Sequence, residues 1–300
     1  MLSLDKDFLK GSIPPLVTPF KNGVVDYDAY AGLVEFQVRE GSHGILINGT
    51  TSEPASLTVE ERNRLIDVGV EAAAGRVTVV AATGSQSFAE TEILTKHAAG
   101  KKGVDALLIV TPYYSRPPQR GLVEYYRVLN AMHDKPWMIY HIPGRAAVDV
   151  KLETAREIDK VCPTFAGMKH ASLDLAYVSD LLEAISHDLR IFVGLEDLSF
   201  PMMAVGACGL MNAVGNLRPK PLSEMCEAVW AGDLNRARDL HHKLFEINKA
   251  VFYDINPIPM KYMMKRIGIL PENEHRLPLM PATAELETRL DGVLKKTGLL

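Results

Sequence analysis

The stretch Ala106-Leu107-Leu108-Ile109-Val110 decides the fold, because five consecutive apolar residues suit a strand that is covered on both faces. Segments of helical period precede it at Ser87–Lys101 and follow it at Leu122–His133. Parallel strands need a crossover between them, and that crossover is usually a helix. An apolar strand between two such segments therefore predicts one unit of a parallel sheet packed between helices.

The same alternation recurs along most of the chain. Short runs rich in Ile, Val and Leu predict eight strands, which we place at Ile13–Val17, Gly44–Asn48, Thr78–Ala82, Ala106–Val110, Trp137–His141, Phe165–Lys169, Arg190–Gly194 and Gly209–Asn212. Predicted helices lie at Tyr27–Glu40, Val59–Ala74, Ser87–Lys101, Leu122–His133, Leu152–Lys160, Leu173–Ser186, Phe200–Val205 and Pro221–Ala231. Eight units in about 230 residues match a closed (β/α)8 barrel of the TIM type, and a doubly wound open sheet is the alternative.

The pattern changes after the eighth unit. Asp233–Ala250, Pro259–Ile267 and Ala282–Lys296 have helical period, and segments that contain prolines separate them. We therefore expect a catalytic barrel over residues 1–232 and a C-terminal helical extension over residues 233–300.

Composition narrows the function. A chain of 300 residues that is 47% hydrophobic and 23% charged is typical of a soluble globular protein. The net charge of -4 gives no case for nucleic acid as a partner, and no apolar run is long enough to span a membrane. Cys162, Cys208 and Cys226 lack the spacing of a metal or redox motif, and Met1–Lys10 lacks a signal-peptide core. We expect a cytoplasmic protein that acts on a small molecule.

Lys169 is the residue that most needs an explanation. It ends the predicted strand Phe165–Lys169, and the carboxyl ends of barrel strands carry the chemistry of this fold. A lysine amine that is partly shielded from water can be neutral, and only the neutral amine attacks a carbonyl to form a Schiff base. The alternative is a lysine that reaches the surface or pairs with a carboxylate.

Other polar residues follow the strands on the same face of the predicted barrel. Gly49-Thr50-Thr51 offers backbone N–H groups and two hydroxyls, which suit a carboxylate but also cap helices. Tyr113, Tyr114 and Tyr140 follow the fourth strand or end the fifth, and tyrosine is more often a core residue with one satisfied hydroxyl. Together these residues predict a site for an anionic carbonyl compound.

Five ordered motifs resemble the dihydrodipicolinate synthase and N-acetylneuraminate lyase family of Schiff-base barrels. They are Gly49-Thr50-Thr51-Ser52-Glu53, Thr111-Pro112-Tyr113-Tyr114-Ser115-Arg116-Pro117, Tyr140-His141-Ile142-Pro143-Gly144-Arg145, Gly167-Met168-Lys169 and Asn256-Pro257-Ile258-Pro259-Met260-Lys261. The resemblance runs from about Gly11 to Leu300, and it is greatest to the dihydrodipicolinate synthase branch.

The resemblance implies a role for each catalytic residue. Lys169 would form an imine with the keto carbon of pyruvate or another 2-oxoacid, so no separate cofactor would be needed. Tyr140 would carry protons to and from the intermediates, and Thr50 would connect it to Tyr114. Tyr114 would come from a neighbouring subunit, which implies a homodimer or a homotetramer.

The resemblance also implies binding residues. Thr51, next to Gly49, would hold the carboxylate of the 2-oxoacid, and Met211 would pack against it. Arg145 would bind the carboxylate of the second substrate, an aldehyde, at the mouth of the barrel. No spacing of histidines and carboxylates predicts a metal site.

Several positions depart from the family pattern. Ser52 stands where glycine is expected, His141 where asparagine is common and His170 where glutamate is common, and we expect all three beside the pocket. The segment Gly194-Leu195-Glu196-Asp197 also departs from the pattern. Pro54–Val59 lacks the histidine found in many members that bind lysine, so we expect no strong inhibition by lysine.

Three functions are compatible with these residues. The first is a lyase that condenses pyruvate with aspartate-semialdehyde, as in 4-hydroxy-tetrahydrodipicolinate synthase. The second is a catabolic relative, such as a 2-keto-3-deoxy sugar acid aldolase or dehydratase, an N-acetylneuraminate lyase or a pyrroline-hydroxycarboxylate deaminase. The third is a non-catalytic protein that binds a 2-oxoacid, which would not need Lys169, Tyr140, Thr50 and Tyr114 together.

Overall fold

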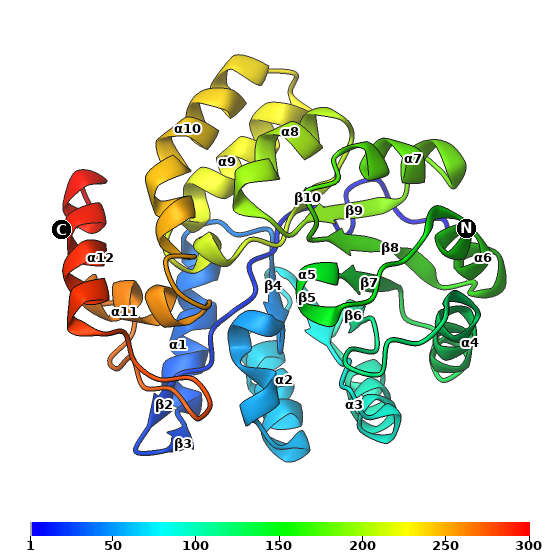
Figure 1. Cartoon of the computed structure of the whole chain (residues 1–300), viewed down its shortest axis with the longest axis horizontal. Helices are drawn as coiled ribbons and strands as arrows, with labels where there is room; N and C mark the ends of the chain where they lie inside the picture. Colours follow the sequence, from blue (N-terminus) through cyan, green and yellow to red (C-terminus); the bar gives the residue numbers. More distant parts are fainter. Residues whose placement is uncertain (1) are drawn as a thin grey trace.

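The computed structural model describes residues 2–300, and it contains the predicted barrel (Figure 1). Eight parallel strands form one sheet in the order β1-β10-β9-β8-β7-β6-β5-β4. Their bounds are Gly11–Ser12 for β1, Gly44–Ile47 for β4, Thr78–Ala82 for β5, Ala106–Val110 for β6, Trp137–His141 for β7, Phe165–His170 for β8, Arg190–Val193 for β9 and Gly209–Leu210 for β10. A bridge between Pro15 and Leu46 joins the two ends of this order, which excludes the open sheet.

The predicted strand Ile13–Val17 is wrong, because β1 comprises only Gly11–Ser12. Pro14 and Pro15 have no N–H group and cannot donate to a regular ladder. The segment still closes the barrel, since the N–H of Leu46 donates to the carbonyl of Pro14 at 2.9 Å.

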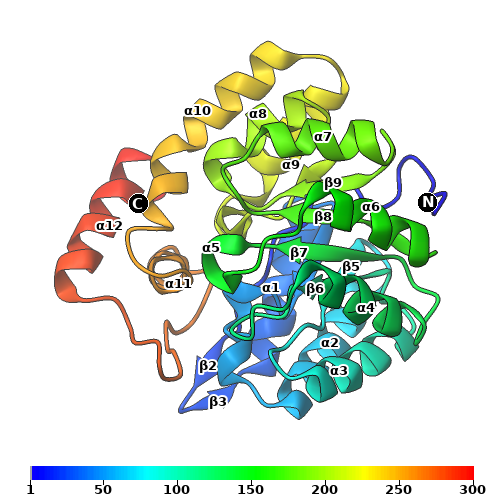
Figure 2. The same cartoon turned by 45° about the vertical axis from the view of Figure 1, so that its right-hand side comes forward.

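Helices surround the barrel (Figures 1 and 2). They are α1 (Tyr27–Arg39), α2 (Val59–Ala73), α3 (Phe88–Gly100), α4 (Gln119–Asn130), α5 (Pro143–Ala146), α6 (Leu152–Val161), α7 (Ala176–Ala184), α8 (Ser199–Ala204) and α9 (Pro219–Trp230). Short 3-10 turns follow strand ends or loops. They are η1 (Thr50–Ser52), η2 (Pro54–Ser56), η3 (Glu196–Leu198) and η4 (Ala213–Asn216). One hairpin was not among the predicted elements. It consists of β2 (Phe20–Lys21) and β3 (Val24–Val25), which are connected by Asn22-Gly23.

Alternation along the strands divides the core into two clusters. Leu108 and Tyr140 belong to the cluster inside the barrel, whereas Leu107 and Ile109 pack in the larger cluster with the helices. Successive strand residues point to opposite faces, so each strand supplies both clusters. A residue at a strand end therefore reaches the mouth of the barrel only if it continues the inner set.

Three helices, α10 (Leu234–Ala250), α11 (Ile258–Arg266) and α12 (Ala284–Lys296), follow the barrel. The connection from α11 to α12 returns beside the β2–β3 hairpin in both views (Figures 1 and 2). There Arg276 donates from Nε to the carbonyl of Gly23 at 3.0 Å and forms an ion pair with Glu61 at 2.7 Å. The C-terminal segment is thus joined to the first part of the barrel.

None of the helices in the described residues is both long and apolar enough to cross a bilayer.

Candidate active site

A bulge in β8 turns Lys169 into the barrel. Ala166 lies in the inner cluster, and strict alternation from it would place Lys169 on the outer side. The pairing of β8 with β7 skips Ala166, and one extra residue reverses the alternation. Lys169 Nζ consequently lies 4.4 Å from the centre of the Tyr140 ring inside the barrel, and the residue is only 3% exposed.

Two glycines make room for this arrangement. A Cβ atom on Gly167 would lie 2.0 Å from the carbonyl oxygen of Arg190 on the neighbouring strand β9. A Cβ atom on Gly194 would lie 3.0 Å from Cε of Lys169. Glycine is therefore needed at Gly167 for the bulge to pack against β9, and Gly194 leaves space for the lysine side chain.

Tyr140 and Thr50 form the first link of the predicted relay. Tyr140 faces inward from β7, and its hydroxyl is hydrogen-bonded to the Thr50 hydroxyl at 3.3 Å. Thr50 begins η1, directly after Gly49, whose Cβ position would lie 3.2 Å from Pro15. Lys169 therefore lies next to the ring of a tyrosine whose hydroxyl is able to exchange protons.

Thr51 is held by a residue far away in the sequence. Asn256, which precedes α11, donates from Nδ2 to the Thr51 hydroxyl at 2.9 Å, and both side chains are buried. The motif that contains Asn256 was noticed in the sequence, but this contact was not predicted, because it spans two distant parts of the chain.

A cavity of about 700 Å³ opens at this end of the barrel. Gly49, Thr50, Tyr140 and Arg145 are among the residues that line it. Thr51 and Met211 are buried at 2% and 1% exposure and are not among them. Half of the eight predicted site residues thus line one cavity. Lys169 is not among the lining residues, and it is buried next to the Tyr140 ring, which does line the cavity.

Arg145 is the available cation at the mouth. Three arginines line the cavity. Arg276 is paired with Glu61, and Arg62 donates to the carbonyls of Ala82 and Gly84 at 3.1 and 3.2 Å. Arg145 is exposed on α5, and its side chain has no hydrogen-bond or ion-pair partner within residues 2–300, so its guanidinium can bind an anionic group.

Tyr114 is not part of the cavity in the single chain. Its side chain is 89% exposed, and its φ of 70° lies in the left-handed region that non-glycine residues rarely adopt. The loop therefore projects an aromatic ring away from the rest of its own chain.

Three of the departures from the family pattern, Ser52, His141 and His170, do not line the cavity, contrary to the expectation that they lie beside it. His141 and His170 face outward from β7 and β8, where their Nδ1 atoms are 3.1 Å apart. Burial, together with His141, lowers the pKa of His170 to about 4. Ser52 is buried and donates to the carbonyl of Leu16 at 2.5 Å. None of the three is among the cavity-lining residues.

Glu196 is a buried acid close to Lys169 that sequence reasoning did not assign to the site. One carboxylate oxygen accepts the N–H groups of Ala213 at 2.6 Å and Val214 at 3.3 Å. Burial raises the pKa of Glu196 to about 7, although these N–H groups and Lys169 oppose the rise. Its position after β9, in the segment Gly194-Leu195-Glu196-Asp197, was the available signal.

Among the described residues, no group of three or more His, Cys, Asp or Glu side chains is arranged to hold a metal ion. A buried lysine, a tyrosine hydroxyl in a hydrogen-bonded pair and a free arginine can instead support covalent chemistry on an anionic carbonyl compound. A (β/α)8 barrel with these residues at one end of its strands is typical of an enzyme that acts on a small carbonyl compound.

The comparisons agree with that class. The family model described as the dihydrodipicolinate synthetase family matches residues 8–297. The chain belongs to this family, and it is an enzyme, a lyase.

Individual relatives cover nearly the whole chain. A 4-hydroxy-tetrahydrodipicolinate synthase from Thermus thermophilus is 44% identical over 97% of this chain and 97% of its own. The crystal structure of dihydrodipicolinate synthase from Aquifex aeolicus has a TM-score of 0.94 at 38% identity and covers 97% of this chain and 98% of its own. The chloride-inhibited dihydrodipicolinate synthase from Acinetobacter baumannii, solved in complex with pyruvate, has a TM-score of 0.92 at 32% identity and covers 97% and 100%.

The predictions of a (β/α)8 barrel, of this family and of its synthase branch are therefore confirmed. The roles assigned to individual residues remain predictions.

Proposed function

We propose that this enzyme condenses pyruvate with aspartate-semialdehyde and holds pyruvate as an imine on Lys169. The observation that carries the proposal is the Lys169 amine, buried 4.4 Å from the ring centre of a tyrosine whose hydroxyl is hydrogen-bonded to Thr50. The pyruvate complex of the Acinetobacter baumannii relative supports pyruvate as the first substrate. The names of the relatives support the synthase reaction.

The reaction begins when the Lys169 amine adds to the keto carbon of pyruvate. Tyr140 delivers a proton to the departing oxygen, water leaves and the imine forms. Loss of a proton from the methyl group gives an enamine, whose carbon adds to the aldehyde of the second substrate. The amine of aspartate-semialdehyde then attacks the imine carbon, which closes the ring and releases Lys169. Each step moves a proton near Tyr140, so one hydroxyl that can donate and accept serves all of them.

Binding uses the rest of the site. Gly49 and Thr51 hold the pyruvate carboxylate through a backbone N–H and a hydroxyl, and Met211 packs against the methyl end. Arg145 binds the carboxylate of the second substrate, because it is the cavity arginine that has no other partner among the described residues. A carboxylate bound to arginine is a strong, charge-assisted contact.

Tyr114 completes the relay in a homodimer or homotetramer. An exposed aromatic ring on a loop in the left-handed region is costly in a free chain, and its insertion into a partner would explain both features. Tyr114 of one subunit then reaches Thr50 of the other. Light scattering tests this arrangement, and a monomer with full activity would contradict it.

Trapping with borohydride tests the central assignment. Incubation with pyruvate and borohydride is expected to leave a covalent adduct on Lys169, located by mass spectrometry, and Lys169→Ala is expected to abolish it. An adduct elsewhere contradicts the proposal. A panel of second substrates then identifies the reaction: turnover with aspartate-semialdehyde supports the synthase, whereas turnover of 2-keto-3-deoxygluconate, sialic acid or pyrroline-4-hydroxy-2-carboxylate supports a catabolic relative.

A further inference from the structure

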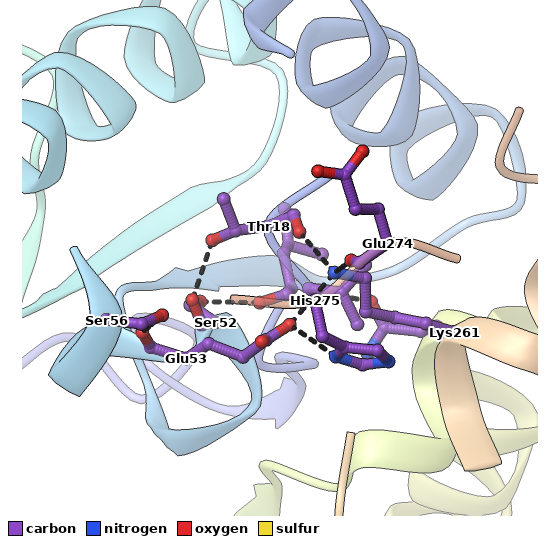
Figure 3. Close-up of polar contacts among 10 residues, drawn as sticks. Thr18, Ser52, Glu53, Ser56, Lys261, Glu274 and His275 are labelled. Carbon is purple, nitrogen blue, oxygen red and sulfur yellow. Dashed lines mark hydrogen bonds and ion pairs between the residues drawn. The ribbon is translucent and has the colours of Figure 1, made fainter. Parts of the chain in front are cut away.

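A buried ion pair joins the C-terminal helices to the loop that carries Thr50 and Thr51. Lys261 on α11 and Glu53 at the end of η1 lie 2.9 Å apart, and their side chains are 0% and 1% exposed. Figure 3 shows Lys261 and Glu53 pointing toward one another from segments that are distant in the sequence. The pair therefore connects the C-terminal segment to the mouth of the barrel.

Lys261 uses all three of its donors. Besides Glu53, it donates to the carbonyl of Thr18 at 2.9 Å and to the carbonyl of Glu274. An ammonium group has three N–H donors and no acceptor, so this lysine is fully satisfied without water. These three hydrogen bonds offset the free-energy cost of burying the ammonium group.

His275 adds a second contact to the same carboxylate oxygen. Its Nδ1 lies 3.1 Å from Oε1 of Glu53, and its side chain is 0% exposed. The other oxygen of Glu53 and Nε2 of His275 have no hydrogen-bond partner among residues 2–300. The carboxylate is thus held through one oxygen, and loss of Lys261 would leave its charge poorly compensated.

Glu53 fixes the loop because of its place in the backbone. It has a φ of 57° and lies between the turns η1 and η2, and its N–H donates to the carbonyl of Thr50 at 3.1 Å. The same loop is held from the barrel side, where the Thr18 hydroxyl donates to the carbonyl of Ser52 at 2.8 Å. Lys261 bonds both Thr18 and Glu53, so one ammonium group connects the two sides of the loop.

We propose that Lys261, acting through Glu53, is a positioning residue that holds Thr50 and Thr51 in place for the imine chemistry, an inference that rests on the function proposed above. A buried ion pair is weak evidence for stability, because desolvation of the two charges offsets most of their attraction. The pair instead contributes geometry, because it fixes the positions of the Thr50 hydroxyl of the relay and of the Thr51 hydroxyl that binds the carboxylate.

Three variants separate positioning from stability. Lys261→Met and Glu53→Gln each remove one charge, and the double variant Lys261→Met/Glu53→Met replaces the pair by apolar side chains of similar length. An apolar replacement of a buried pair is often neutral or stabilising, so the double variant is expected to fold even if the single variants do not. Arg190→Met is the matched control, because Arg190 is a 6% exposed cation that donates to the carbonyls of Asp5 and Phe8.

The expected result is a loss of kcat of roughly ten- to a hundred-fold in the double variant, since misplacement by about 1 Å has this effect. The Michaelis constant for pyruvate is expected to rise several-fold through Thr51, and that of the second substrate is expected to stay unchanged. Arg190→Met is expected to lower thermal stability and leave both Michaelis constants as they are. A double variant with the kcat and pyruvate constant of the unaltered enzyme would overturn the proposal.

A measurement without substrate keeps this proposal distinct from the proposed function. Amide hydrogen exchange of the peptide over residues 49–57 is expected to be faster in the double variant, while exchange in β6 and β7 stays unchanged. If Lys169 traps no pyruvate in the unaltered enzyme, the proposed function fails, and the exchange result still decides whether Lys261 holds the loop. Unchanged exchange in residues 49–57 refutes that role.

Discussion

Gly167→Ala is the sharpest test of how the fold creates the site. The added methyl group would lie 2.0 Å from the carbonyl oxygen of Arg190, whereas ordinary contact begins at 3.4 Å. The two residues are paired between β8 and β9, so neither backbone can move without disturbing the ladder. The bulge must therefore shift by more than 1 Å, and Lys169 follows two residues later.

Two effects of different size are expected from this shift. Overpacking of this kind lowers the free energy of unfolding by about 1–3 kcal/mol. Misplacement of the amine by about 1 Å slows imine formation by roughly 10²-fold. Urea denaturation measures the first effect, and the rate of borohydride trapping with pyruvate measures the second in the fraction that stays folded.

Gly144→Ala is the control, because a Cβ atom on Gly144 meets nothing within 4 Å although α5 lies at the mouth. It is expected to trap pyruvate at the normal rate. If Gly167→Ala also folds with normal stability and traps at the normal rate, the bulge does not set the direction of Lys169, and the account of the site is wrong.

Three further predictions concern other parts of the molecule. Tyr140→Phe keeps the ring but removes the hydroxyl, so steady-state turnover is expected to fall roughly 10²–10⁴-fold with an unchanged circular dichroism spectrum; near-normal turnover would exclude the relay. Arg145→Ala is expected to raise the Michaelis constant of aspartate-semialdehyde about ten- to a hundred-fold and leave pyruvate trapping intact; equal damage to trapping would place Arg145 at the first substrate. The pKa of His170 falls from 6.5 to about 4 on folding, so between these pH values the unfolded chain binds a proton that the folded chain does not. The free energy of unfolding is therefore highest above pH 6.5 and decreases as the pH falls toward 4. Urea denaturation should show a loss of stability over that window, to which His141 also contributes because burial lowers its pKa, and His170→Gln should reduce the loss; an unchanged slope in the variant would show that His170 is not a group responsible.

The strands of the barrel could be predicted because their signal is local. Ala106–Val110, Trp137–His141 and Thr78–Ala82 match their predicted bounds, since continuous apolar runs are long enough to be recognised without knowledge of their neighbours. The first strand failed where Pro14 and Pro15 prevent a regular ladder. Barrel closure at that point depends on Leu46, which is a tertiary partner that local pattern does not reveal.

The candidate site residues could be proposed from the sequence, but the contacts that support them could not. Tyr140 and Lys169 are the penultimate residues of β7 and β8, and their motifs are visible in the sequence. The bulge that turns Lys169 inward is not visible, because it depends on which residue β7 skips. Asn256 and Lys261 act on residues more than 200 positions away, through contacts that only the folded chain creates.

The histidine pair shows that a departure from a family pattern can lie outside the cavity although it is next in sequence to residues of the candidate site. His141 and His170 directly follow Tyr140 and Lys169, and alternation therefore sends them to the outer side of the same strands. There their Nδ1 atoms are 3.1 Å apart, so the two departures contact each other on the side of the strands opposite to Tyr140 and Lys169. Because neither side chain lines the cavity, the pair has no direct contact with a second substrate there. Selection between aspartate-semialdehyde and the alternatives must instead come from residues that do line the cavity, among which Arg145 is the charge available to an acid.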